Sequence, residues 1–239
     1  MVAEERTRLK TCVDDTLYVA EYPIRYAGCD FLARMTLVRL ADGALWLHSP
    51  GTIDGTLKAE IDSLGPVRFV IGPGNFHWLH LGKALELYPD AKTYICPGIE
   101  RKDPTLKFDE FLGDQPPPAW AGEIDQVLVR GTRFIWEVAF FHRPSKTLIL
   151  TDLVENIGDS TPGVGIALKL WWKVVFRMWN KARPAPEYQL GWGHKKAVRA
   201  SLEKIMEWDF ERVILSHGEP IDADAKNIVR EAWRKPLAA

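Results

Sequence analysis

The stretch Val67-Arg68-Phe69-Val70-Ile71 has the apolar, β-branched composition of a short buried strand, and it decides the fold class. Apolar residues recur at helical spacing over residues 78–88, and residues 93–96 have the composition of a second strand. A strand, a helix and a strand in this order predict a parallel strand pair joined by a right-handed crossover. We therefore expect an α/β fold.

Further strands and helices are predicted on both sides of this unit. The turn Ala41-Asp42-Gly43 joins two of the strands into an antiparallel hairpin. Strands are expected over 17–21, 35–40, 44–48, 124–129, 135–141, 147–150 and 212–216, and helices over 56–64, 165–181, 194–208 and 223–233. Because strands precede helices in both halves, we predict a four-layer αβ/βα sandwich, with two mixed sheets face to face and helices outside. One domain over residues 1–239 is expected.

The composition is that of an ordinary globular protein. The formal net charge is -1 and the sequence pI is about 6.6, so no overall field would attract nucleic acid. Three widely spaced cysteines form no C-x-x-C pair, which argues against a disulfide framework or a cysteine zinc site. The charged N-terminus has no apolar segment typical of a secretory signal, and we expect a cytoplasmic protein.

Potential metal ligands follow the ends of several predicted strands. They are His48, His77, Asp152 and His217. In open α/β sheets, ligands bind beyond the carboxyl ends of strands, and zinc accepts both histidine and aspartate donors. Taken singly, each residue is as well explained by a turn, a cap or a local hydrogen bond. A functional site is favoured because several potential ligands occur at the same kind of position, after the end of a strand.

Eight short segments, distributed over nearly the whole chain, together match a known pattern. They are 35–40, 47–50, 64–67, 88–92, 120–127, 140–146, Leu148-Ile149-Leu150-Thr151-Asp152-Leu153 and Val213-Ile214-Leu215-Ser216-His217-Gly218. With these segments the chain resembles the metallo-β-lactamase-like superfamily and, within it, a group of proteins of unknown function. The resemblance implies the αβ/βα sandwich already expected from the pattern of strands and helices.

Active members of that superfamily carry an H-x-H-x-D-H motif between a strand and a helix. In the register that we favour, His77 resembles the last histidine of the motif, whereas Gly72, Gly74 and Phe76 stand in place of the first two histidines and the aspartate. A register one residue later aligns Pro73, Asn75, His77 and Trp78, and it is no better for metal binding. No counterpart of a further metal histidine is found near residues 130–137.

Two further positions of the superfamily are retained, so the resemblance implies a reduced metal site. Asp152 resembles the metal-bridging aspartate and His217 the final histidine. His77, Asp152 and His217 would serve the same metal, and the expectation is one zinc, iron or manganese ion in place of a dinuclear zinc centre. We expect His48, Asn75 and His142 around the same pocket, with His142 bonded to a turn carbonyl.

Residues 165–181 predict a helix rich in tryptophan and basic residues. Its Lys169, Lys173, Arg177 and Lys181 recur every four residues and would share one face. Three interpretations stay open: a helix packed on the sheet with a solvated basic edge, a lid or dimer face, and an interfacial helix on an anionic membrane. The resemblance places the segment beside the pocket, which favours a lid.

Two functions are consistent with these features. One is a hydrolase-like protein in which a single metal ion activates water against an ester-like or phosphoester bond of a small molecule. The alternative is a non-catalytic protein that keeps the fold and binds a ligand or a partner at the same strand ends. Fold alone does not separate the two.

Overall fold

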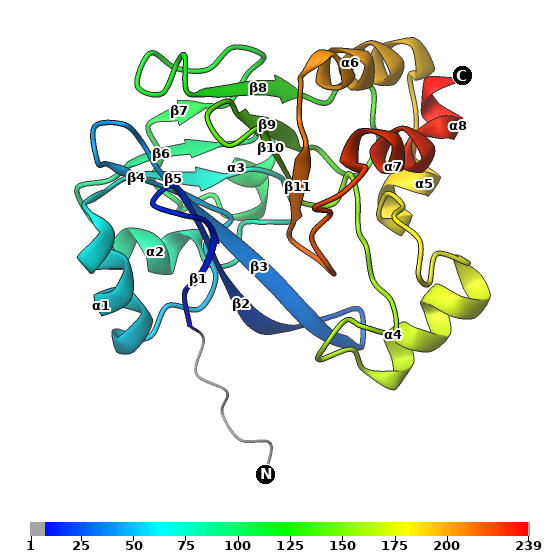
Figure 1. The fold of residues 1–239 in the computed structure, drawn as a ribbon, viewed down its shortest axis with the longest axis horizontal. Coiled ribbons are helices and arrows are strands. Elements are labelled where there is room, and N and C mark those ends of the chain that lie inside the picture. The colour runs from blue at the N-terminus through cyan, green and yellow to red at the C-terminus, as the bar shows by residue number, and fades with distance from the viewer. Residues whose placement is uncertain (1–7, 239) are drawn as a thin grey trace.

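The computed structural model describes residues 8–238, which form two β-sheets with helices on their outer faces (Figure 1). The first sheet has seven strands in chain order: β1 (Lys10–Val13), β2 (Leu17–Tyr26), β3 (Cys29–Arg39), β4 (Leu45–His48), β5 (Val67–Gly72), β6 (Lys92–Ile95) and β7 (Glu110–Phe111). The second has four, in the order β11 (Arg212–Leu215), β10 (Thr147–Leu150), β9 (Val138–His142) and β8 (Ile124–Leu128).

Nine helical segments connect and cover these sheets in the described part of the chain. They are α1 (Gly55–Leu64), α2 (Leu81–Leu87), α3 (Ile99–Lys102), α4 (Ile166–Leu170), the π-helical turn η1 (Trp171–Val175), α5 (Pro186–Gly191), α6 (Lys195–Glu207), α7 (Ala225–Ala232) and α8 (Arg234–Leu237). The short elements α3, β7 and α5 were not expected from the sequence, because two to six residues are too few to show a hydrophobic period.

Both sheets are mixed, as predicted. Strands β1 to β4 pair in antiparallel fashion, and β4 to β7 pair in parallel. The crossover from β5 through α2 to β6 confirms the predicted strand–helix–strand unit. In the second sheet β8, β9 and β10 are antiparallel, whereas β11 lies parallel to β10.

The second sheet buries both of its faces. In β9, Phe140 joins the core shared with the seven-stranded sheet, whereas its neighbour Phe141 packs with the helices on the other side. Ile149 and Leu150 divide in the same way along β10. Because side chains alternate between the two faces of a strand, neighbouring residues enter different cores. On the first sheet, helices α1 and α2 cover the outer face through Leu57, Ile61, Leu81 and Ala84. The arrangement is the predicted αβ/βα sandwich.

The β2–β3 hairpin is much longer than the sequence indicated. It pairs residues from Leu17 to Tyr26 with Val38 to Cys29, whereas strands were expected only over 17–21 and 35–40. Pro23 has no N–H to donate to a neighbouring strand, but β1 covers β2 only as far as Val19, so Pro23 lies on an open edge where the missing N–H is tolerated. The outer half of this hairpin extends away from the rest of the sheet (Figure 1).

The single helix predicted over 165–181 is wrong in length and form. Helix α4 passes into the π turn η1, and helical structure ends at Val175. Arg177 and Asn180 have positive φ values of 54° and 57°, which turn the chain away from any helical path. The four basic residues therefore do not form one stripe along a continuous helix.

Candidate metal centre

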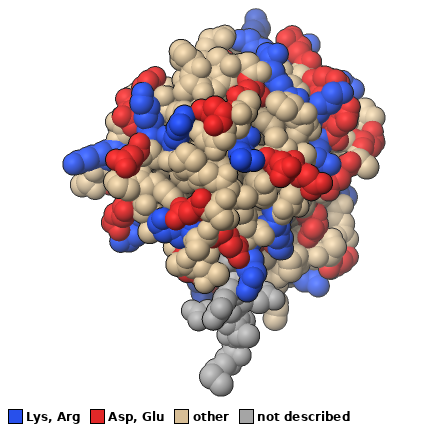
Figure 2. All heavy atoms as spheres, turned by 60° about the vertical axis from the view of Figure 1, so that its left-hand side comes forward, with Lys and Arg blue, Asp and Glu red and all other residues tan. Residues whose placement is uncertain are grey.

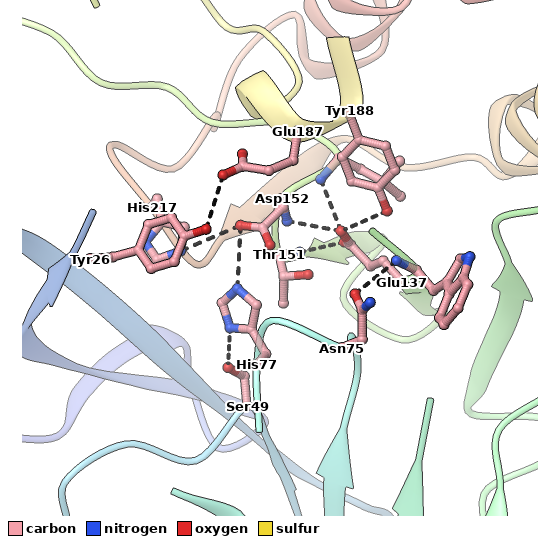
Figure 3. Close-up of polar contacts among 12 residues, drawn as sticks. Tyr26, Ser49, Asn75, His77, Glu137, Thr151, Asp152, Glu187, Tyr188 and His217 are labelled. Atoms are coloured by element: carbon pink, nitrogen blue, oxygen red, sulfur yellow. Dashed lines mark hydrogen bonds and ion pairs between the residues drawn. The ribbon is translucent and has the colours of Figure 1, made fainter. Parts of the chain in front are cut away.

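His77, Asp152 and His217 lie together at one edge of the two sheets (Figure 3). His77 is in the loop after β5, Asp152 follows β10 by two residues, and His217 follows β11 by two residues. Strand β5 is parallel to β6, and β10 is parallel to β11. The loops that follow the carboxyl ends of these strands therefore lie at a common edge. Three residues that are distant in sequence thus meet, as expected.

The spacing of their donor atoms fits one small metal ion. Asp152 Oδ1 lies 3.3 Å from His77 Nε2 and 3.5 Å from His217 Nε2, and one ligand atom from each residue lies within 4.8 Å of the others. Ligand atoms about 2.1 Å from a tetrahedral zinc ion are separated by roughly 3.4 Å. The three side chains are at most 9% exposed, so they form a buried donor set of two imidazoles and one carboxylate.

The other ring nitrogen of each histidine has its own partner. His217 Nδ1 donates to the carbonyl oxygen of Leu32 at 3.2 Å, and His77 Nδ1 lies 2.8 Å from Ser49 Oγ. Because a carbonyl oxygen only accepts, Nδ1 of His217 carries the proton and its Nε2 offers a lone pair. Such hydrogen bonds fix the orientation of histidine ligands in metal sites.

The protonation of the three residues is coupled by their proximity. Burial lowers the pKa of His217 to about 4, which keeps its imidazole neutral. For His77, burial is outweighed by the Asp152 carboxylate, and the net result is a raised pKa. For Asp152, burial is likewise outweighed by the two imidazoles, first His77, and the pKa is lowered.

Glu137, which sequence analysis missed, holds the segment that carries Asp152. Its carboxylate is fully buried and accepts the backbone N–H groups of Thr151 at 2.6 Å, Asp152 at 2.9 Å and Leu153 at 3.0 Å. Burial and the nearby Asp152 charge raise its pKa to about 7, although the N–H donors oppose the shift. The available signal was a lone carboxylate in the apolar run Phe134-Ile135-Trp136-Glu137-Val138.

A cavity of about 310 Å³ opens beside the three residues. The tip of the β2–β3 hairpin, the loop after β5 and the α4–η1 segment form its walls, which are mostly apolar. Aromatic residues dominate this lining: Tyr22, Tyr26, Phe31, Phe76, Trp78, Trp171, Trp172 and Phe176.

Two further carboxylates line the cavity near Asp152. Glu155 is 5% exposed, and its Oε2 has no hydrogen-bond partner among the described residues. Burial, together with the charges of Asp152 and Glu187, raises the pKa of Glu155 well above its usual range. Glu187 is half-buried and accepts a hydrogen bond from the Tyr26 hydroxyl at 3.3 Å. Neither carboxylate was identified from the sequence, since both lie outside the recognised segments.

The two glycines in place of motif histidines are closely packed. A Cβ atom at Gly72 would lie 2.8 Å from both Ile99 Cδ1 and Leu81 Cδ1, and one at Gly74 would lie 2.9 Å from the backbone oxygen of Trp136. Neither position has room for a larger side chain without a shift of its neighbours.

The three residues expected around the pocket do not line it. His48 is 1% exposed and packs against both Trp46 and Phe140 in the core between the sheets. Asn75 accepts the N–H of Trp136 and donates to the Phe134 carbonyl, so it joins two loops. His142 is fully buried, and its Nδ1 lies 2.7 Å from the Ser145 hydroxyl, not at a turn carbonyl. The sequence showed that these residues lie near strand ends, but it did not show toward which face of the sheet each side chain points.

Comparison with known proteins supports this fold. The family model described as a domain of unknown function (DUF4336) matches residues 29–187, and no curated protein matches the chain. Among solved structures, a metallo-β-lactamase from Pontibacter korlensis aligns with TM-score 0.62 and 11% identity over 96% of this chain and 100% of its own. The FIM-1 metallo-β-lactamase of Pseudomonas aeruginosa, in its mono-zinc form, aligns with TM-score 0.60 and 10% identity over 97% of both chains.

A third structure extends the similarity beyond β-lactamases. The Flv1 flavodiiron core from Synechocystis sp. PCC6803 aligns with TM-score 0.64 and 12% identity, over 97% of this chain and 61% of its own. At such identities the likeness is one of fold. The fold is therefore that of the metallo-β-lactamases, as the sequence segments implied.

Replacement of His48 by Phe will reduce the loss of stability in acid. Neither ring nitrogen of His48 has a hydrogen-bond partner among the described residues, and burial, aided by His77, lowers its pKa to about 3. The unfolded chain takes up this proton below about pH 6.5 and the folded chain does not, so stability falls as the pH falls from 6.5 toward 3. At pH 5, the lowered pKa of His48 reduces the free energy of unfolding by about 2 kcal/mol.

The measurement is urea unfolding of both proteins at pH 7.5 and pH 5.0. We expect the His48→Phe variant to lose about 2 kcal/mol less than the wild type between the two pH values. An equal loss in both proteins would show that His48 is protonated in the folded state.

Glu137→Gln will destabilise the protein and disturb Asp152. The amide can accept through one oxygen only, and its NH₂ group would face backbone N–H donors, which leaves buried donors unpaired. We expect a loss of about 2–4 kcal/mol in the free energy of unfolding by urea denaturation. Glu203→Gln, on the exposed face of α6, is the matched control. A loss below about 1 kcal/mol would contradict the anchoring role.

Proposed function

The chain belongs to the family described as a domain of unknown function (DUF4336), and on this premise we propose that it is a hydrolase-like protein with a single metal ion. The observation that carries the proposal is the convergence of His77, Asp152 and His217 beside an apolar cavity. The substrate that we propose is a small, mainly apolar molecule with an ester-like bond.

His77 and His217 would bind the ion through Nε2, and Asp152 through its carboxylate. Two imidazoles and one carboxylate suit zinc, iron or manganese, and three protein ligands leave a position open, as catalytic sites require. The mono-zinc form of the FIM-1 enzyme gives a precedent for one ion in this fold. When bound, such an ion supplies Lewis acidity, which polarises a carbonyl and makes water more acidic.

A second ion is not part of the proposal. The motif that would hold it is degraded, because Gly72, Gly74 and Phe76 stand where histidines and an aspartate would be needed. The close packing at both glycines is consistent with this interpretation, since a histidine at either position would require its neighbours to shift. The site is thus a reduced form of the dinuclear centre.

Glu155 is the residue that we assign to proton donation. Its carboxyl is buried and lines the cavity, and burial raises its pKa well above the usual range, which favours the protonated form. When water adds to the carbonyl carbon and loses a proton, and the ester C–O bond breaks, the departing oxygen would take a proton from Glu155, whose carboxylate would then take up the proton lost by the water. The walls of the cavity are mostly apolar, and such an environment strengthens electrostatic interactions inside the site.

The lining also limits the substrate class. Of the described residues around the cavity, only Arg25 is a lysine or arginine, and it lies 3.7 Å from Asp30. Three carboxylates, Asp152, Glu155 and Glu187, face the same space. Apart from the proposed metal ion, the described lining offers only Arg25, which is already paired with Asp30, to offset the negative charge of a phosphoester, so a neutral ester is favoured. The cavity volume limits the substrate to a small molecule.

Metal content tests the first part of the proposal. Protein purified without chelator or a nickel affinity tag should contain about one equivalent of zinc, iron or manganese by elemental mass spectrometry. Asp152→Ala and His217→Ala should each lose nearly all of it. His194→Ala, which removes an exposed histidine at the start of α6, should retain it.

Wild-type protein that contains no metal and is nevertheless stably folded would overturn the proposal. The non-catalytic alternative, a pocket protein that binds a ligand, would then stand in its place. Equal metal loss in the His194→Ala control would show that the metal binds elsewhere.

Glu155→Gln tests the second part, because glutamine cannot donate the proton. For an alkyl ester, whose leaving group needs protonation, we expect kcat/KM to fall by about 10²-fold or more. For the p-nitrophenyl ester of the same acyl group, which leaves without protonation, the fall should be much smaller. The metal content should not change, and Glu203→Gln is the control. Equal losses on both esters would contradict an acid role for Glu155.

A further inference from the structure

Exposed apolar side chains are concentrated on the α4–η1 segment. Of the ten large hydrophobic residues that are exposed in the described chain, five lie within residues 166–175. Ile166 is 88% exposed and Val174 is 60% exposed. The set, called here the outer face of α4–η1, comprises Ile166, Leu170, Trp171, Val174 and Val175.

The fold does not require this outer face for its own packing. The opposite side of the same segment supplies Leu168 and Trp172 to a small core with Cys29 and Phe31 of β3. Trp172 and Phe176 also line the cavity. The segment is thus apolar on both sides, and one side has no partner among the described residues, whereas an ordinary surface helix is polar on its outer side.

Basic side chains lie on the same segment and directly after it. Lys169 and Lys173 lie over the ring of Trp179, at 5.4 Å and 5.0 Å from its centroid. Arg177 and Lys181 follow in the turn after η1, and both are exposed. The nearest acidic partner is Asp159, whose carboxylate lies 3.9 Å from Lys173 Nζ. On the face drawn in Figure 2, by contrast, acidic and basic residues are interspersed.

We propose that the outer face of α4–η1 docks on an anionic lipid surface. Apolar residues with tryptophan at the boundary and lysine or arginine around them are the chemistry of a segment that lies in the headgroup layer. The contact is interfacial: in the described part of the chain, no helix is both long and apolar enough to cross a bilayer. The docked segment would lie parallel to the membrane.

Charge favours lipid over a second copy of the chain as the occupant. A symmetric dimer through this face would bring the basic residues of this segment toward those of the partner copy, and among the described residues only Lys173 has an acidic side chain within ion-pair distance, Asp159. Such like-charge contacts are unfavourable, whereas each basic residue near an anionic membrane contributes about 1 kcal/mol, a factor of roughly five in affinity.

Docking would place the mouth of the cavity at the membrane. Trp171 belongs both to the outer face and to the cavity wall, and exposed Leu79 and Tyr26 line the cavity as well. In Figure 1, α4 lies at the lower right, apart from helices α6 and α7. An apolar molecule could then pass from lipid to the cavity along continuous apolar surface. The lipid contact itself does not depend on any metal.

The test is flotation of the purified protein with vesicles of phosphatidylcholine alone or mixed with phosphatidylglycerol. Wild-type protein should float with the anionic vesicles, and high salt should weaken the binding. The double variant Leu170→Glu/Val174→Glu should bind at least about tenfold more weakly, because it replaces two exposed apolar side chains with anionic ones. Lys169→Gln/Lys173→Gln should bind roughly 25-fold more weakly, because each lost charge costs a factor of about five.

Phe111→Glu on β7 is the matched control, since Phe111 is also exposed, at 51%, but lies at the opposite side of the molecule (Figure 1). It should bind as the wild type does. Absence of binding to anionic vesicles, or an equal loss in the Phe111→Glu control, would overturn the proposal. So would a dimer in sedimentation velocity without lipid that Leu170→Glu/Val174→Glu dissociates. Because flotation needs no turnover, its failure would leave the metal-site proposal intact.

Discussion

Apolar packing between the inner faces of the two sheets is the constraint on which the rest of the structure depends. Its centre is an edge-on contact between Trp46 of β4 and Phe140 of β9, whose ring centroids lie 4.9 Å apart. Protein interiors are packed as closely as molecular crystals, so the sheets cannot slide past one another without opening cavities. The packing therefore holds the ends of β5, β10 and β11 at one edge, where His77, Asp152 and His217 meet.

Buried polar groups then fix the loops that leave those strands. Glu137 gathers three successive N–H groups around Asp152, and the guanidinium of Arg34 on β3 donates to the Leu215 carbonyl just before His217. Charge-assisted hydrogen bonds of this kind are strong in a dry interior, and they orient side chains that carry no apolar surface of their own. Packing of the core thus positions the strand ends, and these hydrogen bonds then orient the loops that carry Asp152 and His217.

Most of the fold could be predicted from the sequence, whereas less of the site could. The strands and their parallel or antiparallel order follow from hydrophobic period and turn residues, which are local properties. The predicted helix over 165–181 failed because η1 and the positive φ of Arg177 end it, and periodicity alone does not show such a break. The outer half of the β2–β3 hairpin was not predicted; Pro23 is compatible with a strand there because its edge of β2 is open, which only the tertiary structure shows.

By itself, the sequence determined that His77, Asp152 and His217 follow strand ends, since strand and turn signals are written in neighbouring residues. Only the tertiary structure decided which polar side chains share that edge. A period of two says that His48 and His142 point to one face of a strand, but burial of that face depends on the opposing sheet. Glu155 becomes a buried cavity residue for the same reason: its environment is built by segments that are distant in the chain, the β2–β3 hairpin and α4–η1.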